Sequence, residues 1–150
     1  ALVCYDTDTR RVRMHRHEPN AQILGACAMG MGIAEHHSVL VIEQIESFGM
    51  AVGKEVFETV FWSGRFWEAW PGAERVRMPR RTVKLHLCHS ARATDANIRA
   101  ALIDRFGGGL GKVSAIGLKA SPGPLYGLRS HDWAALALAV TWAETRPTGA

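Results

Sequence analysis

The feature that most constrains the fold is a continuous apolar segment, SVLVIEQI, at residues 38–45. A β-branched run of this length is typical of a strand that is covered on both faces, as in the parallel sheets of α/β proteins. The run ends on the carboxylate of Glu43. Because a buried carboxylate without a partner is strongly destabilising unless it becomes protonated, Glu43 requires a metal ion or a cation beside it. Glu46 lies in the following turn and is expected to be solvated.

Strands and helices are expected to alternate around this segment. The expected strands cover residues 1–6, 12–17, 38–45 and 82–88, the first two forming an antiparallel hairpin. The expected helices cover residues 21–37, 49–70, 90–108 and 130–145, the last with Ser130 as its N-cap. A basic turn is expected at 75–81, and the glycine-rich segment 107–130 is predicted to be a long mobile loop. This order predicts an α/β fold, a mixed sheet with helices on both faces.

The length of 150 residues suits a single domain that spans the whole chain. The net charge of +4 mildly favours an anionic partner. The three cysteines, Cys4, Cys27 and Cys88, are widely spaced in apolar surroundings, which predicts buried thiols in a reducing compartment and not a disulfide framework. No apolar run approaches the roughly 18 residues of a membrane span, so no membrane association is expected.

Two positions carry the strongest functional signal. Glu43 closes a central strand, and open α/β sheets bind ligands at the carboxyl ends of their strands; the alternative is an ion pair with a nearby arginine at the sheet edge. His131 and Asp132 open the last helix. A cation is disfavoured at a helix N-terminus, so a neutral imidazole that binds a metal or a phosphate suits His131. An acidic residue in the first turn, such as Asp132, simply complements the helix dipole.

The basic residues and the remaining histidines allow weaker inferences. A set of cations in turns or beside the glycine-rich segment is expected to contact phosphates, with solvated surface as the alternative for each. The members retained as DNA-binding candidates are Arg80, Arg81, Arg92, Lys112 and Lys119. The pairs His36–His37 and His15/His17 have ligand spacing, but they lack acidic or cysteine companions in the sequence and are interpreted as surface residues.

Three segments, taken together, resemble the RuvC-type Holliday-junction resolvases, and most closely the RuvC-like nucleases of phages and prophages. They are VLVIEQIESFGMAVGKEVFETVFWSGRF, HLCHSARATDANIRAALIDRFGG and PGPLYGLRSHDWAALALAVTW, and YDTDTRRVRMHRHEPNAQIL is similar to the second and third strands of that group. The resemblance covers nearly the whole chain and implies an RNase H-like fold.

The resemblance also implies an activity. Members of this family are endonucleases that hydrolyse phosphodiesters with two Mg²⁺ or Mn²⁺ ions, which stabilise the attacking and leaving oxygens. Glu43 matches the central-strand glutamate between the ions, and His131 matches the first position of the last-helix motif, where it helps to bind a metal or the scissile phosphate. The resemblance further implies branched DNA as substrate, segment 107–130 beside the DNA, a homodimer, and the cytoplasm of a bacterial or phage-infected cell. The aromatic helix 50–70 is the candidate dimer contact, or else packs simply on the sheet.

Two departures from the family pattern bear on activity. The first strand of the family ends in an aspartate within an Ile-Asp-Pro-Gly segment that this chain lacks, so this strand is expected upstream of Ala1. The aspartate that follows one turn after His131 in other members is replaced by Ala134. Asp6, Asp8 and Asp132 are the candidate substitutes. Two alternatives therefore stand beside the junction-resolving nuclease: a non-catalytic nucleic-acid-binding domain, and an RNase H-like enzyme that acts on RNA–DNA hybrids or linear DNA.

Overall fold

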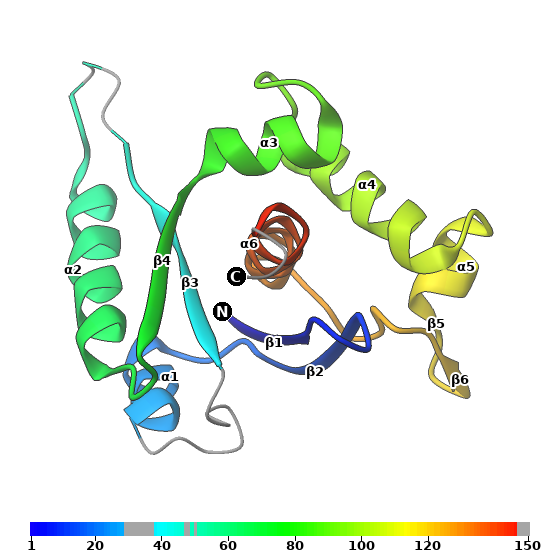
Figure 1. The fold of residues 1–150 in the computed structure, drawn as a ribbon, viewed down its shortest axis with the longest axis horizontal. Helices are drawn as coiled ribbons and strands as arrows, with labels where there is room; N and C mark the ends of the chain where they lie inside the picture. The colour runs from blue at the N-terminus through cyan, green and yellow to red at the C-terminus, as the bar shows by residue number, and fades with distance from the viewer. Residues whose placement is uncertain (29–37, 47–48, 50, 147–150) are drawn as a thin grey trace. The chain divides into compact units, whose positions relative to one another are not determined.

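The computed structural model describes residues 1–28, 38–46, 49 and 51–146 of a mixed α/β protein (Figure 1). The chain divides into two compact units. One comprises Ala1–His17 together with Arg81–Ala150, and the other comprises Glu18–Arg80. Each unit is considered by itself below, and the expectation of a single domain stays a prediction.

The unit Glu18–Arg80 is built around two parallel strands. Strands β3 (Val39–Gln44) and β4 (Glu74–Pro79) pair with Val41 opposite Val76 and Glu43 opposite Met78. The helix α2 (Lys54–Ala69) connects them and packs against β3 and against α1 (Asn20–Ala28) (Figure 1). Helix α2 ends at Trp70, which is extended because the residue before a proline is disfavoured in the helical region. The predicted helix at 21–37 is thus confirmed for its described part, and the one predicted at 49–70 is confirmed from Lys54 onward.

Two predictions for this unit are wrong. The segment 38–45 was expected to be buried on both faces, yet Leu40 is the one residue of β3 that is buried. Its partner strand β4 occupies most of the segment expected to be a basic turn. The alternation of Arg75 and Arg77 with Val76 and Met78 is a period of two, which indicates a strand with one apolar side. The arginine-rich composition of this segment suggested a solvated turn. In the strand, the Arg75 guanidinium instead donates a hydrogen bond to the carbonyl oxygen of Trp70 at 2.7 Å.

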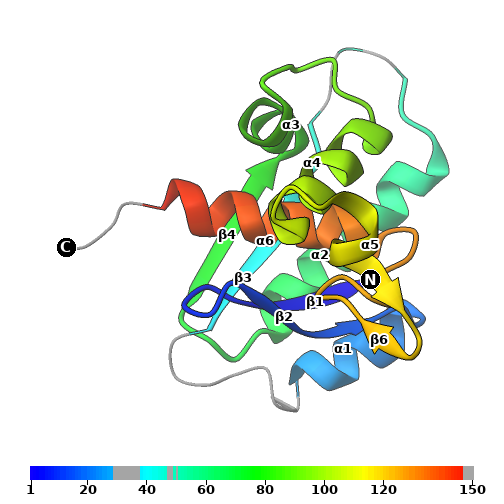
Figure 2. The ribbon, with the colours of Figure 1, turned by 90° about the vertical axis from the view of Figure 1, so that its right-hand side faces the viewer.

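The other unit packs a hairpin and several helices around α6 (Asp132–Thr145). The hairpin consists of β1 (Leu2–Asp6) and β2 (Arg11–Arg16), which pair antiparallel as predicted. Helix α6 packs on this hairpin and also contacts α4 (Asp95–Gly107), and Figure 2 shows α6 lying above β1 and β2. The largest apolar side chains that are fully buried in the described part of this unit are Leu102, Leu125, Leu136 and Val140. The predicted helices at 90–108 and 130–145 are confirmed, with starts a few residues later than expected.

Two further segments of this unit differ from expectation. Residues 82–88 form a helix, α3 (Arg80–Cys88), and not a strand, because Val83 and Leu87 lie one turn apart and are both buried. The expected mobile loop 107–130 contains the helix α5 (Gly111–Ile116) and a short hairpin of β5 (Gly117–Leu118) and β6 (Ser121–Pro122). The amides of Gly123 and Leu125 donate to the carbonyls of Ile116 and Ala115, which holds this segment in place.

The described strands form three separate two-stranded sheets, of which β3–β4 is parallel and the other two are antiparallel. The α/β class is therefore confirmed. The RNase H-like arrangement of a single mixed sheet with helices on both faces stays a prediction.

Candidate functional site

Glu43 lies near the carboxyl end of β3, where the sequence predicted a ligand-binding residue. Its Oε2 accepts a hydrogen bond from Nη1 of Arg80 at 3.3 Å, and about a third of each side chain is exposed. This contact is the ion pair with a nearby arginine that was the alternative to metal binding. Because the pair is partly solvated, its net contribution to stability is no more than about 1 kcal/mol.

The first turn of α6 holds its two polar residues in opposite environments. His131 is the N-cap residue and is exposed, whereas Asp132 is completely buried. The expected N-cap, Ser130, instead has a positive φ of 45° and precedes the helix. The turn is closed by two hydrogen bonds: the Asp132 amide donates to the Arg129 carbonyl at 2.9 Å, and the Arg129 amide donates to Oδ2 of Asp132 at 3.1 Å.

Two histidine rings contact the buried carboxylate of Asp132, and a third ring stacks on one of them. Nδ1 of His17 lies 3.3 Å from Oδ1, and Nδ1 of His15 lies 3.4 Å from Oδ2. The ring of His131 stacks on that of His17 with centroids 6.0 Å apart and planes 7° from parallel. His15 and His17 were expected to be surface residues, and their side chains are about a third exposed. The acidic companion that the sequence did not show is Asp132.

This cluster is assembled from two elements that are distant in the sequence. His15 lies on β2 and His17 follows that strand directly, so both side chains leave the same side of the hairpin. Helix α6 packs against β1 and β2 and brings Asp132 to that side. The spacing of the histidines was visible in the sequence. Their acidic partner was not, because it depends on how the hairpin docks on the last helix.

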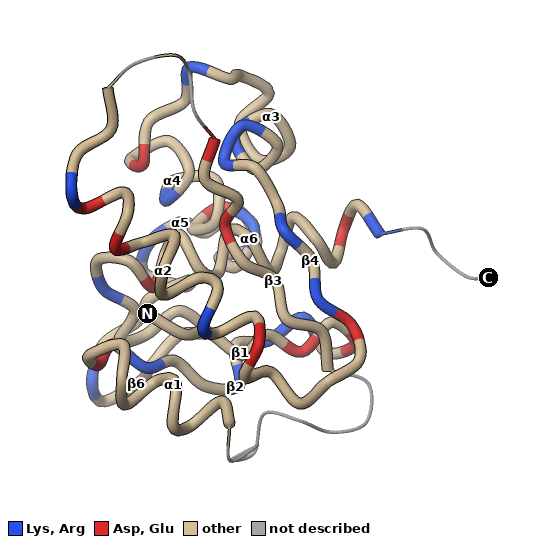
Figure 3. The backbone as a smooth tube through the Cα atoms, turned by 90° about the vertical axis from the view of Figure 1, so that its left-hand side faces the viewer, with Lys and Arg blue, Asp and Glu red and all other residues tan. Residues whose placement is uncertain are grey.

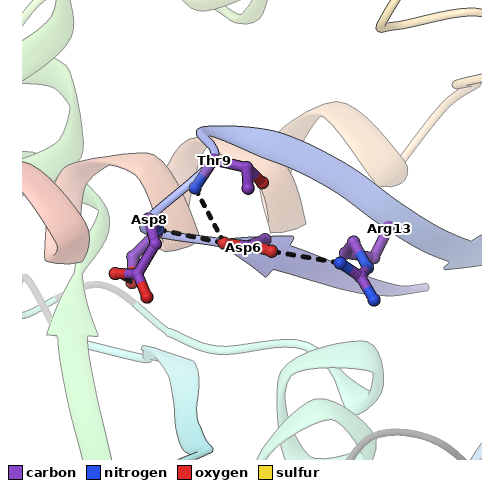
Figure 4. A network of polar contacts seen from close by, with 5 residues as sticks. Asp6, Asp8, Thr9 and Arg13 are labelled. Carbon is purple, nitrogen blue, oxygen red and sulfur yellow. Dashed lines mark hydrogen bonds and ion pairs between the residues drawn. The ribbon is translucent and has the colours of Figure 1, made fainter.

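The candidate substitutes for the missing family aspartates are engaged elsewhere. Both oxygens of Asp132 face imidazole nitrogens, so Asp132 does not serve as an exposed metal ligand. Asp6 accepts hydrogen bonds from the amides of Thr9 and Asp8 and pairs with Arg13 at 3.2 Å (Figure 4). The bond from the Thr9 amide is the main cause that lowers the pKa of Asp6.

The position of the second family aspartate is apolar. Ala134 lies in the first turn of α6 and is half-buried. Among the residues that the structure describes, no group of three or more His, Cys, Asp or Glu side chains is arranged to hold a metal ion. The assignment of Glu43 and His131 as metal ligands stays a prediction.

The predicted site residues are distributed over both units. Glu43 and Arg80 belong to the unit Glu18–Arg80, and His131 belongs to the other unit. The remaining DNA-binding candidates, Arg81, Arg92, Lys112 and Lys119, are exposed and belong to the unit that holds His131. Figure 3 shows how Lys and Arg are distributed along the backbone.

Comparison of the chain with protein-family models, with curated proteins and with solved structures finds no match. None of the helices in the described part of the chain is long and apolar enough to cross a membrane.

Proposed function

We propose that this chain is a metal-dependent endonuclease of the RuvC type, which hydrolyses phosphodiester bonds in branched DNA such as a four-way junction. The observation that carries the proposal is the accessibility of the two motif residues: Glu43 near the carboxyl end of β3 is partly exposed, and His131 at the N-terminus of α6 is exposed. A carboxylate and an imidazole can both bind divalent metal ions, as the two-metal site implied by the sequence resemblance requires.

The chemistry requires little of the chain beyond placing charges. Two hard divalent cations, Mg²⁺ or Mn²⁺, would supply the activated water and stabilise the leaving oxygen. Glu43 would contribute a carboxylate ligand. Displacement of the Arg80 guanidinium from Glu43 by a divalent metal ion would cost little free energy, because the Glu43–Arg80 ion pair is partly solvated. Arg80, once released, is placed to contact a phosphate. His131 would bind a metal or hydrogen-bond the scissile phosphate.

The remaining cations would hold the DNA. Arg81, Arg92, Lys112 and Lys119 are exposed side chains that neutralise phosphates without reading sequence. A two-fold cut of a junction requires two active sites related by symmetry, so we propose a homodimer as the acting species. Helix α2 is the candidate contact, because Phe57, Val60 and Phe61 are exposed on it.

The test is cleavage of a synthetic four-way junction, a matched linear duplex and an RNA–DNA hybrid, each with Mg²⁺, with Mn²⁺ and with chelator. We expect metal-dependent cleavage of the junction, with losses of at least about a hundredfold for Glu43→Gln and His131→Ala. Glu46→Gln is the matched control, because Glu46 is an exposed carboxylate two residues after the end of β3. Junction cleavage that persists undiminished in Glu43→Gln would refute the assigned site, and preference for the hybrid would refute the substrate.

A second function is favoured by the Glu43–Arg80 ion pair and by Ala134. In a non-catalytic nucleic-acid-binding domain, the arginine would replace the metal as the partner of Glu43 and no further carboxylate would be needed. This function predicts junction binding that is sensitive to salt and unaffected by chelator, with no cleavage under any metal condition. Binding and cleavage assays on the same substrates therefore separate the two functions.

A further inference from the structure

We propose that an apolar tip formed by Leu110, Val113 and Leu118 inserts against unstacked bases at the branch point of a DNA junction. This contact rests on the proposed function only in that branched DNA is the partner. It does not require cleavage, so a nuclease and a non-catalytic binding domain can both make it.

The apolar tip is the most exposed apolar part of the described chain. Among the large apolar residues that the structure describes, Val113 is 81%, Leu110 80% and Leu118 72% exposed, and these are the three highest values. Leu110 is the N-cap residue of α5 and Val113 follows three residues later, so both lie on one face of this helix. Leu118 lies on β5, which follows α5 directly and contacts it. Exposed apolar residues that are grouped on adjoining elements, and not scattered singly, indicate a binding surface.

The base of the apolar tip is held in place by packing and hydrogen bonds. Ala115 lies on the opposite side of α5 from Val113 and is completely buried, and its carbonyl oxygen accepts a hydrogen bond from the Leu125 amide at 2.8 Å. A Cβ atom at Gly117 would collide with the carbonyl oxygen of Ser121, so β5 and β6 approach each other more closely than a side chain allows. Figure 1 shows α5 and this hairpin beyond the C-terminal end of α4. A surface that is ordered before binding loses little conformational entropy when a partner arrives.

The charges beside the apolar tip favour an anionic partner. Residues 106–131 include no aspartate or glutamate, but they include Lys112, Lys119 and Arg129. Lys112 and Lys119 are exposed, and each is next in the sequence to a residue of the apolar tip. In the part of the chain that the structure describes, neither lysine has an ion-pair partner. DNA complements both features, because its phosphates can pair with the lysines while its bases offer apolar faces.

The small size of the apolar tip suits insertion into DNA better than attachment to a membrane. Membrane binding strengthens with the apolar area that is buried in the lipid, and α5 has only six residues. Proteins that kink DNA, in contrast, insert single apolar side chains such as leucine between base steps.

Insertion should select branched DNA over linear DNA. Separating stacked bases costs free energy, and this cost is smallest where bases are already unpaired or unstacked. The centre of a four-way junction interrupts the continuous stacking of the duplex arms. The apolar tip is therefore expected to act at the branch point, with Lys112 and Lys119 on the flanking phosphates.

The test uses 2-aminopurine, a base whose fluorescence rises when it is unstacked, at the branch point of a four-way junction and at the same position of a matched linear duplex. Binding is measured with chelator, so that cleavage does not intervene. We expect the unsubstituted protein to raise the fluorescence of the junction and to bind it more tightly than the duplex. Leu110→Ser/Val113→Ser and Leu118→Ser should abolish the rise and reduce the preference for the junction roughly tenfold.

The substitutions lie at exposed positions, and serine is favourable at an N-cap, so α5 should still form. Leu110→Met retains an apolar side chain and should preserve the fluorescence rise. Leu85→Ser is the matched control, because Leu85 is an exposed leucine on α3, outside the apolar tip, and it should behave as the unsubstituted protein does.

The possible outcomes separate insertion from the proposed function. An undiminished fluorescence rise in folded Leu110→Ser/Val113→Ser would refute insertion and leave junction binding intact. A rise that depends on the apolar tip, without cleavage when Mg²⁺ or Mn²⁺ is added, would support insertion and refute only the nuclease. If the unsubstituted protein did not bind the junction, both proposals would fail. In that case, sedimentation with phosphatidylserine vesicles or self-association, either one abolished by Leu110→Ser/Val113→Ser, would assign the apolar tip to a lipid surface or to a second copy of the chain.

Discussion

Asp132 and Asp6 are carboxylates in opposite surroundings. Asp132 is fully buried and is compensated by two imidazoles and one backbone amide. Asp6 lies at the turn of the first hairpin, where two backbone amides and Arg13 stabilise its charged form. The burial of Asp132 makes it a positioning residue for His15 and His17, whereas the contacts of Asp6 make it a stabiliser of the turn.

The turn stabilised by Asp6 should be weakened by acid. The hydrogen bond from the Thr9 amide is the largest of several contacts that lower the pKa of Asp6 from its ordinary value of 3.8. A lowered pKa in the folded state stabilises the protein at pH values above the ordinary one, and this contribution is lost as the pH falls through the folded-state value. We therefore expect Asp6→Asn to lower Tm at pH 7 and to have a smaller effect near pH 3.

Thermal unfolding at the two pH values checks this prediction. Asp8→Asn is the control, because Asp8 is its neighbour in the same turn and its carboxylate makes an exposed contact with Thr7. If Asp6→Asn lowered Tm equally at both pH values, the loss of stability would come from the changed side-chain atoms and not from the loss of the carboxylate charge.

Cys27 should be the least reactive of the three thiols. It is 2% exposed in α1, and burial raises its pKa. The thiolate is the nucleophilic form, so both a raised pKa and poor access slow alkylation. We expect iodoacetamide to modify Cys88, which is half-buried, faster than Cys27 in native protein, with equal rates in denaturant. Mass spectrometry of peptides after timed quenching measures both rates, and faster labelling of Cys27 would contradict the packing of α1.

Single positions could be predicted from the sequence, and so could an arginine beside Glu43, but the acidic partner of His15 and His17 could not. Glu43 was expected at the end of a strand and His131 at the start of a helix, and both are there. The spacing of His15 and His17 was also visible. That Asp132 lies between them depends on a contact between segments more than a hundred residues apart, which no local pattern encodes.

Among the elements, helix α4 has the most complete N-terminal signal. The Thr94 hydroxyl accepts a hydrogen bond from the Asn97 amide, while the Asn97 side chain accepts one from the Thr94 amide at 2.8 Å. This reciprocal arrangement satisfies two amides that the helix itself cannot pair. A cap of this kind can be recognised in a sequence, because a capping residue acts within one turn and needs no distant partner.

Removal of this cap should destabilise the protein measurably. Thr94→Ala removes the hydroxyl acceptor, and we expect the free energy of unfolding to fall by about 1 kcal/mol. Thr82→Ala is the control, since Thr82 is exposed within α3 and alanine is the better helix former there. Urea denaturation followed by circular dichroism measures both. A destabilisation of similar size in Thr82→Ala would mean that the effect is not specific to the cap.

The elements that were predicted wrongly share a physical cause. Segment 82–88 carries apolar residues at alternating positions as well as one turn apart, and the packing of Val83 and Leu87 selects the helix. Strand β4 was not predicted, because its arginines are typical of a solvated turn. In the structure, Arg75 donates a hydrogen bond to the carbonyl oxygen of Trp70, and the Arg77 guanidinium lies 5.4 Å from the centre of the Trp67 ring. Tertiary contacts decided both cases, because the local signal was ambiguous.

At the scale of the whole molecule, the chain combines a small parallel αβ unit with a larger unit centred on α6. The α/β class could be predicted because the apolar runs and helix caps are local. The pairing of strands into three small sheets could not, since it depends on register and on contacts that the sequence does not display. The exposed cations of the proposed DNA-binding set belong mainly to the larger unit, which is therefore the part we expect to hold nucleic acid.

The salt dependence of junction binding tests that expectation. A cation that neutralises a phosphate releases counterions, so the slope of log K against log salt concentration should become shallower by roughly 0.9 for each such cation that is removed. Arg81→Ala/Arg92→Ala removes two exposed cations of the larger unit. We expect this double variant to bind the junction more weakly at low salt and with a shallower slope than the unsubstituted protein.

The matched control is Arg11→Ala/Lys54→Ala, which removes the same net charge from exposed positions outside the proposed DNA-binding set. If long-range attraction by the net charge of +4 were the whole cause of binding, affinity would fall equally in the two double variants. Direct binding to phosphates requires a larger decrease in Arg81→Ala/Arg92→Ala, because only a cation that lies against a phosphate displaces its counterion. Fluorescence anisotropy of a labelled junction across a salt series distinguishes the two causes, and equal slopes in the two variants would remove these arginines from the interface.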